Sequence, residues 1–499
     1  MNADQREQVR SNAKYLRRVR PIDPDEIYEY VDGQPHPAAV AQVLRESAVD
    51  LGLLERDDGT FEPVEAGALS VSFHGVDAFP VEYGRVLEDR LVAEYGPGWP
   101  DGDSGDRLRE RIRSFKADYF EQRAVAYDAE TALAYGLYHL PDYYAVAQYA
   151  LADLAGEGLL PTHLRVLDVG AGVGGPALGL HDLVPEDALV DYHAVEPSAA
   201  GDVLEALLGE TGRNFHHAVH RETAEAFDPG ALASEFGDDS DSEGEHDDTD
   251  DGDAGFDLIL FSNVLSELDD PESVVERYAE ALAEDGTIVG LAPADRNTAT
   301  GLREVERSVA DRGPLTIYGP DVRLWPGETP ADDCWSFEVK PDIEVPVFQR
   351  RLDDGEPGES RLDGPERRDG EFENTDVQYA YTYLRRDGSR RVDFTPDDSR
   401  VARLAKSEDL VTERANVYLA KLSRDLSDDG HPLFRVGDGS QQVDHFAVLT
   451  DESMLNSDLL TAEYGDVLSI ENALVLWNDD EGAVNLVIDG ETVVDRVPV

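Results

Sequence analysis

The chain has 499 residues, and its 107 acidic residues against 43 basic ones give a formal net charge of −64 at pH 7. This length is sufficient for roughly two to four domains that bury substantial cores. With 41% hydrophobic residues, the composition is not that of a disordered acidic chain. The single cysteine, Cys334, excludes a disulfide bond within the chain and any metal site that needs several cysteines.

Lysine is rare, so nearly all of the positive charge is arginine. Dense carboxylates with few lysines are typical of proteins that work in molar salt, and we expect an extreme halophile, such as a halophilic archaeon, as the source. At 1 M salt the Debye length is about 3 Å, so most of the self-repulsion is screened. The net charge therefore does not exclude nucleic acid as a partner. Whether the protein can bind it depends on local surfaces of arginine and aromatic residues.

Membrane and export signals are not evident. No apolar run reaches the roughly 18 residues of a membrane-spanning helix, and residues 1–10 lack the apolar stretch of a signal peptide. We therefore expect a cytoplasmic protein.

The most informative motif is V-L-D-V-G-A-G-V-G-G at residues 166–175. It continues an apolar strand expected at Arg165–Val169 and leads into a predicted helix. Gly170, Gly172 and Gly174 allow a ligand to approach the backbone closely. The start of the helix presents free N–H groups to an anionic group.

A second apolar strand is expected at Asp191–Val195 and leads directly to Glu196, whose carboxylate can accept hydrogen bonds from two ribose hydroxyls. Pro197 and Ser198 would shape the adenosine edge of such a site. The motifs together predict a nucleoside-cofactor site. Its expected residues are Asp168, Gly170, Ala171, Gly172, Gly174, Glu196, Pro197, Ser198 and Asn263.

Two nucleoside cofactors are compatible with this spacing. Gly170, Gly172 and Gly175 also match the G-x-G-x-x-G fingerprint of dinucleotide sites. Asp168, however, can engage the ammonium group of a methionine moiety, whereas it would repel the pyrophosphate of NAD. The motif also follows a long N-terminal region, while many NAD domains open the chain. The pattern therefore favours S-adenosylmethionine (SAM).

Strands alternate with helices between residues 160 and 395, which predicts an α/β fold. We expect residues 151–395 to form a Rossmann-like, seven-stranded class I methyltransferase core. Further strands are expected at 214–219, 256–262 and 287–291. Cys334–Val339 and Val377–Leu384 are expected to form a final antiparallel pair.

Three smaller expectations concern the segments around this core. Residues 1–150 should be mostly helical, and a helix at 37–51 followed by a hairpin turned at Asp58-Gly59 hints at a winged-helix-like element. Asn297 is expected to cap a helix that ends near residue 311. Residues 238–254 form an acidic insert that should be a solvated loop, and its His246 is more simply explained as solvated than as a metal ligand.

Four arginines alternate with acidic residues in one predicted helix: Arg107, Arg109, Arg111 and Arg113. This alternation spreads them around the helix. It favours a salt-bridged surface over an RNA-binding groove.

Residues 405–499 show short alternating strands separated by turn signals, in the order of a five-stranded OB-like β-barrel. Such barrels commonly bind single-stranded nucleic acid through aromatic residues. The candidates are Phe434, Arg435, His445, Phe446 and Trp477. Because alternate residues point into a barrel, each of these aromatic residues is more often part of the core than a platform for bases. A barrel that contacts only protein therefore remains the alternative.

The order of motifs also resembles a known family. Helical T-A-L-A-Y-G-L-Y-H-L-P-D-Y-Y-A-V precedes the glycine motif, and V-E-P-S, S-N-V-L-S-E-L, D-D-C-W-S-F and Q-Y-A-Y-T-Y-L follow it. Over residues 130–390 this resembles the methyltransferase-like family associated with assembly of the small ribosomal subunit, best known from mitochondria. The resemblance implies SAM as cofactor and the small subunit with its rRNA as partner.

Two departures from that family matter. Its members often carry several cysteines before the tryptophan segment that ligate an iron–sulfur cluster, whereas here Cys334 stands alone, so we expect no cluster. Members also tend to end the fifth strand with glutamate, where this chain has Ala292-Pro293. The C-terminal barrel is not part of the family pattern and looks like an added module that contacts RNA or protein.

No catalytic signature is evident, and Asn263 and Glu267 are the candidates nearest the expected methyl group. Ser262-Asn263-Val264-Leu265 differs from the [D/N]-P-P-[Y/F] of amine-directed nucleic-acid enzymes. Three functions remain open: an rRNA methyltransferase, a SAM-binding assembly factor without methyl transfer, and a small-molecule methyltransferase with an accessory barrel.

Overall fold

The structure is a computed structural model, and it describes residues 1–121, 123, 125–236, 255–320, 322–325, 327–331, 334–358, 368–397 and 399–498. The predicted acidic insert and His246 lie outside these residues. The chain divides into two compact units. The first contains residues 1–262, 280–286 and 342–377, and the second contains 263–279, 287–341 and 378–499.

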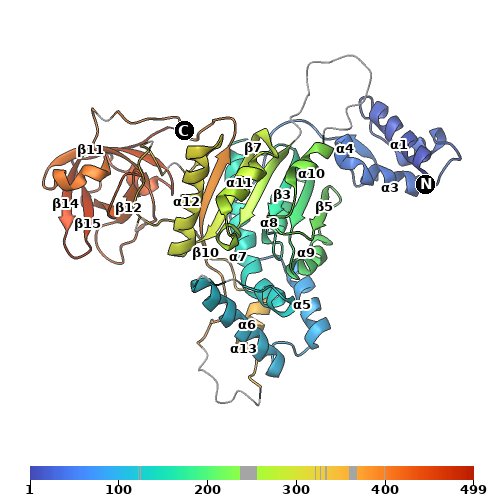
Figure 1. The fold of residues 1–499 in the computed structure, drawn as a ribbon, viewed down its shortest axis with the longest axis horizontal. Coiled ribbons are helices and arrows are strands. Elements are labelled where there is room, and N and C mark those ends of the chain that lie inside the picture. The colour runs from blue at the N-terminus through green and yellow to red at the C-terminus, as the bar shows by residue number, and fades with distance from the viewer. Residues whose placement is uncertain are drawn as a thin grey trace. The chain divides into compact units, whose positions relative to one another are not determined.

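The N-terminal part of the first unit is helical, as its sequence predicts (Figure 1). Its helices are α1 (Ala3–Leu16), α2 (Pro24–Ile27), η1 (Tyr28–Tyr30), α3 (Pro37–Glu46), α4 (Ala48–Leu51), α5 (Val81–Tyr95), α6 (Gly102–Phe120) and α7 (Ala129–Gly156). The expected hairpin forms between β1 (Leu53–Glu55) and β2 (Phe61–Pro63), which pair antiparallel. Apolar side chains of α1, α3 and the hairpin share one buried cluster.

The four alternating arginines of α6 all pair with carboxylates, in line with the salt-bridged interpretation. Arg113 contacts Glu371 at 2.7 Å, and Arg107 and Arg111 both reach Glu130. Arg109 is only 2% exposed and is fixed by Asp106 and by two backbone carbonyl oxygens. These side chains are therefore committed to internal contacts.

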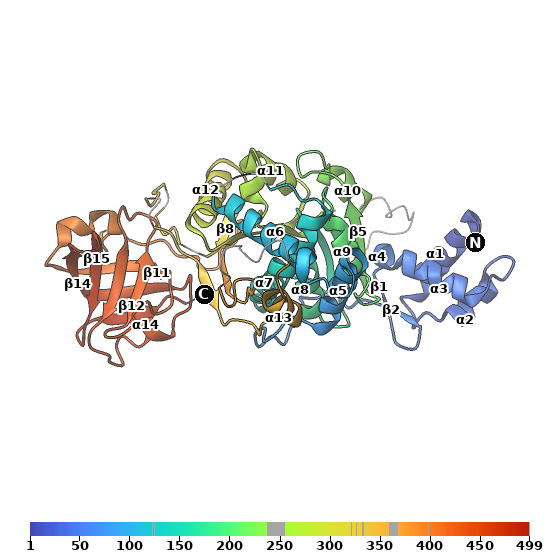
Figure 2. The same ribbon diagram turned by 90° about the horizontal axis from the view of Figure 1, so that it is seen from below.

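Four parallel strands form the sheet of the first unit. They are β3 (His163–Val169), β4 (Leu189–Val195), β5 (Phe215–His220) and β6 (Phe256–Ser262), in the order β5-β4-β3-β6. Between them run α8 (Gly175–Leu183), α9 (Ala200–Leu208) and α10 (Pro229–Glu235). The long apolar α7 packs along α8, and α9 contacts both helices (Figure 2). The helix α13 (Val347–Asp354) contacts α5 and α7.

Several histidines lie on β3 and β5, and their side chains are partly shielded from solvent. Burial lowers the pKa of His163 to about 4, and it also lowers the pKa of His216, His217 and His220. The His163 Nε2 atom is buried without a hydrogen-bond partner among the described residues. The ring must therefore stay neutral for the fold to be most stable.

We expect this burial to make the fold acid-sensitive. An unfolded histidine titrates near pH 6.5, so the contribution of His163 is complete above that pH and is lost as the pH falls toward about 4. When the pH falls from 6.5 to 4, wild type should lose roughly 2 kcal/mol more unfolding free energy than His163→Gln. This value is already reduced because the side chain is partly exposed. Urea unfolding at several pH values measures it, and the exposed His74→Gln is the control. Identical pH slopes in all three proteins would contradict this assignment.

The second unit contains η3 (Leu265–Glu267), α11 (Pro271–Ala279), α12 (Arg296–Arg312), β8 (Thr316–Gly319) and β9 (Glu338–Lys340). It also contains most of β7 (Leu282–Pro293), from Thr287, and of β10 (Val377–Arg385), from Gln378. β10 pairs antiparallel with β7 and β8. The strand order along the sheet is β5-β4-β3-β6-β7-β10-β8, and β9 pairs with β10. The described sheet therefore has eight strands, not the seven that we predicted.

One further expectation about this region was wrong, and another is confirmed only in part. Asp295, not Asn297, caps α12, because its carboxylate accepts the N–H groups of Asn297 and Thr298. The expected pairing of Cys334–Val339 with Val377–Leu384 exists between β9 and β10, but β9 begins only at Glu338, and β10 also pairs antiparallel with β7 and β8.

The C-terminal part of the second unit is a closed β-barrel (Figure 2). Its elements are η5 (Leu404–Leu410), β11 (Arg414–Lys421), β12 (Leu433–Gly437), β13 (His445–Leu449), α14 (Asp458–Thr461), β14 (Val467–Asn478), β15 (Ala483–Ile488) and β16 (Val493–Arg496). The order is β11-β12-β13-β15-β14, and β14 pairs back with β11 to close five strands. β13 and β15 are parallel, and β16 adds to β14.

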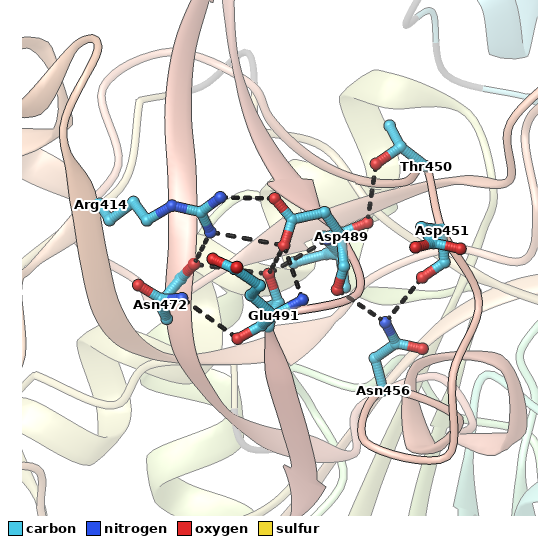
Figure 3. Close-up of polar contacts among 9 residues, drawn as sticks. Arg414, Thr450, Asp451, Asn456, Asn472, Asp489 and Glu491 are labelled. Atoms are coloured by element: carbon cyan, nitrogen blue, oxygen red, sulfur yellow. Dashed lines mark hydrogen bonds and ion pairs between the residues drawn. The ribbon is translucent and has the colours of Figure 1, made fainter.

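A polar network ties together the loops at one end of the barrel (Figure 3). Arg414 at the start of β11 forms an ion pair with Asp489, which follows β15. Asn472 in β14 donates from Nδ2 to the Glu491 carbonyl oxygen at 3.1 Å. The hydrogen bonds from Arg414 and from the Glu491 N–H lower the pKa of Asp489.

Asn456 is the buried member of this network, with 0% exposure. Its Nδ2 donates to the carbonyl oxygens of Asp451 and Asp489 at 3.0 and 3.1 Å (Figure 3). Its Oδ1 accepts the Ser453 N–H. Asn456→Ala should therefore lower the free energy of unfolding by about 3 kcal/mol, because three hydrogen bonds are lost and buried carbonyls stay unpaired. Urea unfolding measures it. Asn478→Ala, which removes one exposed hydrogen bond, should cost under about 1 kcal/mol. Equal losses in the two variants would contradict the role of Asn456.

Candidate cofactor site

The glycine turn after β3 has the backbone that its sequence predicts. Gly170, Gly172 and Gly174 adopt φ angles of 70°, 55° and 97°, in the left-handed region that favours glycine. A Cβ atom on Gly174 would also come within 2.6 Å of Leu204 Cδ1. The turn leads into α8, whose N-cap is Gly174, so free N–H groups lie at this end of the sheet.

Glu196 follows β4 and holds the glycine turn directly. Its Oε2 accepts the Gly172 N–H at 2.9 Å, and its Oε1 accepts the Ser198 N–H at 2.8 Å. The residue is 6% exposed. A carboxylate offers about four lone-pair sites, so each oxygen can still accept one hydroxyl hydrogen. Glu196 is therefore placed both to shape the turn and to receive a ribose.

Asp168 is the most perturbed carboxyl group of the site. It is fully buried near the end of β3, where Tyr192 Oη donates to its Oδ2 at 2.6 Å. Burial raises the pKa of Asp168 to about 7, and the charge of Glu196 acts in the same direction. Its Oδ1 is buried and has no hydrogen-bond partner among the described residues. A cationic donor would satisfy this oxygen.

These residues are compatible with SAM. The unpaired Asp168 Oδ1 can accept from the ligand's ammonium group, the free lone pairs of Glu196 can accept from its ribose, and the glycine turn leaves room for its methionine portion. The two neighbouring carboxyl groups would repel the pyrophosphate of a dinucleotide. Tyr192 is the residue of this site that sequence analysis missed. A tyrosine in a buried strand resembles a core residue, and only the structure brings its hydroxyl to Asp168.

The two catalytic candidates belong to the second unit. Asn263 is 8% exposed and has a φ of 60°, rare for a residue other than glycine, and its N–H donates to the Leu291 carbonyl oxygen at 2.9 Å. Such backbone strain is common at functional sites. Glu267 is an exposed residue of η3, and its placement does not assign it a role.

The barrel residues expected to contact nucleic acid divide into two groups. Phe434 and His445 are 3% and 1% exposed, and His445 Nε2 contacts Ser407 Oγ at 2.8 Å, so these two rings lie inside the barrel. Arg435 pairs with Asp444 and lies over the ring of Phe446. Trp477 is 37% exposed. Only the second group offers surface to a ligand.

The tryptophan segment of the family resemblance is anchored within the second unit. Trp335 Nε1 donates to the Ala294 carbonyl oxygen at 3.0 Å, and Ser336 Oγ contacts Tyr464 Oη at 3.1 Å. The Cys334 thiol lies 3.8 Å from the carbonyl oxygens of Gln441 and Val443. These are packing contacts of a folded segment.

Three family models match the chain. Residues 138–338 match a methyltransferase domain. Residues 6–57 and 405–497 match the N-terminal and the C-terminal domain of a domain of unknown function, DUF8157. No curated protein matches the sequence, and no described helix is long and apolar enough to cross a membrane.

Solved structures that match the chain include EvdMO1, at 12% identity and a TM-score of 0.25, for which the match covers 57% of this chain and 46% of EvdMO1. The CurJ carbon methyltransferase matches at 14% identity and a TM-score of 0.30 over 76% of this chain and 91% of CurJ. The putative RNA methyltransferase PH1948 from Pyrococcus horikoshii matches at 12% identity and a TM-score of 0.26, over 48% of this chain and 83% of PH1948.

The strand order, the glycine turn and the family match agree for one part of the chain. Residues 138–338 carry a methyltransferase domain, with the Rossmann-like core of class I SAM-dependent methyltransferases.

Proposed function

We propose that the chain is a SAM-dependent methyltransferase that modifies RNA of the small ribosomal subunit in a halophile. The observation that carries the methyltransferase part is the pair of carboxyl groups beside the glycine turn. Asp168 has a buried oxygen without a partner, and Glu196 has free lone pairs next to Gly172. The pyrophosphate of NAD would be repelled by both.

The barrel supports RNA as the substrate class. Its five strands follow the order β11-β12-β13-β15-β14, with β13 and β15 parallel and with α14 between the third and fourth strands. We infer from this order that the barrel is OB-like. OB barrels bind single strands through aromatic and arginine side chains. Arg435, Phe446 and Trp477 are the residues that would make such contacts.

The protein has little covalent chemistry to perform in such a reaction. The bound cofactor supplies an activated methyl group, so this chain contributes binding, orientation and exclusion of water. Asp168 would hold the ammonium group of the ligand and Glu196 its ribose, and the glycine turn would lie along its methionine portion. The substrate nucleophile must then approach in line with the bond that breaks.

A SAM-binding assembly factor without methyl transfer is the second candidate. Asn263 is followed by Val264, not by the prolines typical of amine-directed nucleic-acid enzymes. This departure removes a known catalytic signature and leaves cofactor binding intact.

Methyl transfer to ribosomal particles tests the proposal. Tritiated SAM is offered with 30S particles from a deletion strain in molar KCl, and Glu196→Ala is the control. Incorporation into RNA that the variant loses supports the proposal. Cofactor binding and co-sedimentation with 30S particles without incorporation would favour the assembly factor. Cofactor binding without co-sedimentation would favour a small-molecule substrate.

A further inference from the structure

A histidine–carboxylate pair lies in α7 on the side of the glycine turn. His139 Nδ1 is 3.3 Å from Asp142 Oδ2, one helical turn further along. The two side chains are 19% and 11% exposed. Both residues lie in the helical segment T-A-L-A-Y-G-L-Y-H-L-P-D-Y-Y-A-V of the family resemblance, but the sequence assigned neither of them a role.

The carboxylate of this pair is held in an unfavourable environment. Burial raises the pKa of Asp142, against the opposing effects of His139 and of the hydrogen bond from Asn374. Asp142 Oδ1 is buried and has no hydrogen-bond partner among the described residues. A carboxylate left partly unpaired is stabilised when its neighbouring imidazole becomes charged.

The imidazole is oriented for proton transfer. His139 Nδ1 faces two groups, Asp142 Oδ2 at 3.3 Å and Asn374 Nδ2 at 3.4 Å. Because Asn374 Nδ2 already donates to the Tyr138 carbonyl oxygen at 3.1 Å, we assign the ring hydrogen of Nδ1 to the carboxylate contact, which leaves Nε2 as the acceptor. Nε2 makes no hydrogen bond with the described residues. The ring is stacked on Tyr143, with centroids 4.9 Å apart and planes at 8°, and it also contacts Tyr135 and Phe115. These rings fix its position.

The glycine turn and the loop that follows Glu196 both border the aromatic rings around His139. A Cβ on Gly136 would lie 3.9 Å from Val173, and a Cβ on Gly175 would lie 2.8 Å from Tyr143 Cβ. Because residues three and four apart share one side of a helix, His139 lies between these two contacts with the glycine turn. The loop that follows Glu196 is adjacent as well, since the Ala199 N–H donates to the Tyr127 carbonyl oxygen and Tyr127 packs edge-on against Tyr135.

We propose that His139 is the general base of methyl transfer and that Asp142 is its positioning residue, an inference that rests on the proposed methyltransferase function. The substrate N–H or O–H nucleophile attacks the methyl carbon as the carbon–sulfur bond breaks, and the sulfur keeps that electron pair. The substrate proton passes to His139 Nε2. The resulting imidazolium is paired with Asp142. This pairing explains why a carboxylate lies buried beside His139.

Activity and binding are measured together on full-length His139→Ala in molar KCl. SAM affinity should stay within about twofold of wild type, while single-turnover methyl transfer at pH 7 falls by about 100-fold or more. Added imidazole should restore part of the rate, which a merely structural role would not allow. Full activity in His139→Ala, or a loss that imidazole does not rescue, would overturn the assignment. His74→Ala, at an exposed position, is the control.

The rate of methyl transfer tests the positioning role of Asp142. Asp142→Asn removes the carboxylate that faces His139 Nδ1, so it should lower the single-turnover rate by roughly tenfold or more and leave SAM affinity within about twofold of wild type. The double variant His139→Ala/Asp142→Asn should be no slower than His139→Ala alone, because Asp142 acts through His139. Lys116→Met, at a residue of α6 whose Nζ donates to Tyr138 Oη at 2.7 Å, is the control and should keep the wild-type rate. An unchanged rate in Asp142→Asn would overturn the role of Asp142.

Chemical modification separates the failure of this inference from the failure of the proposed function. Diethyl pyrocarbonate modifies neutral imidazoles, and S-adenosylhomocysteine should slow modification of His139 at least about fivefold while leaving His74 unchanged, because only His139 borders the ligand. Ligand binding without protection would overturn the placement of His139 whether or not the protein methylates. Protection with no methyl transfer by wild type would overturn the proposed function and, with it, the catalytic role.

Discussion

Asp168→Asn should weaken SAM binding by about 100-fold at pH 7.5, because a charged hydrogen bond to the ligand's ammonium group is lost and a buried amide replaces it. The free carboxyl group has a pKa of about 7. In wild type the affinity should therefore rise with pH up to about 7, since only the carboxylate binds the ammonium group. Below that pH it should fall by up to about tenfold per unit.

Calorimetry across pH 5.5 to 9 in molar KCl measures this profile. The ligand's own α-amino group loses its proton near pH 8, so the wild-type profile should be bell-shaped with an acid limb that belongs to Asp168. Tyr192→Phe is the informative control. It removes the hydroxyl that donates to Asp168 Oδ2 and should move the acid limb to higher pH without abolishing binding. An Asp168→Asn protein that keeps the acid limb would rule out this role for Asp168.

Glu196→Ala should reduce SAM affinity by at least about 100-fold. The variant loses the acceptors for two ribose hydroxyls and also the anchors of the Gly172 and Ser198 N–H groups. Its effect should depend on the sugar. Wild type should bind S-adenosylhomocysteine more tightly than the 2′-deoxy analogue, whereas the variant should bind the two ligands about equally.

Calorimetric titrations of both proteins with both ligands form a double-mutant cycle that isolates the carboxylate–hydroxyl contact. Glu196→Gln should lie between the two proteins, because its amide oxygen can still accept one hydrogen bond. If the sugar preference of wild type persists in Glu196→Ala, the ribose binds elsewhere.

The geometry of the candidate cofactor site was predictable from the sequence because its signals are local. The positive φ angles of Gly170, Gly172 and Gly174 and the position of Glu196 after β4 follow from residue types at fixed offsets along the chain. The barrel strands were also predictable, because alternation of apolar residues is a property of each strand by itself.

The remaining features depend on contacts between segments far apart in sequence. β8 has four residues and no period of its own, so only its pairing with β10 defines it, and the count of seven strands was therefore wrong. Phe434 and His445 were candidates for nucleic-acid contact because of their residue types. In the alternation of their strands, however, both side chains point into the barrel. Tyr192 and the His139–Asp142 pair lie in apolar elements, where a polar side chain gives no pattern that a sequence can show.

A crystal structure of the protein with S-adenosylhomocysteine bound tests the cofactor site most directly. We expect the ligand's amino group to lie within hydrogen-bond distance of Asp168 Oδ1, its ribose hydroxyls to contact Glu196, and its sulfur to lie beside the Gly172–Gly175 turn. A ligand bound away from the glycine turn, or a ribose without a contact to Glu196, would contradict the central claim.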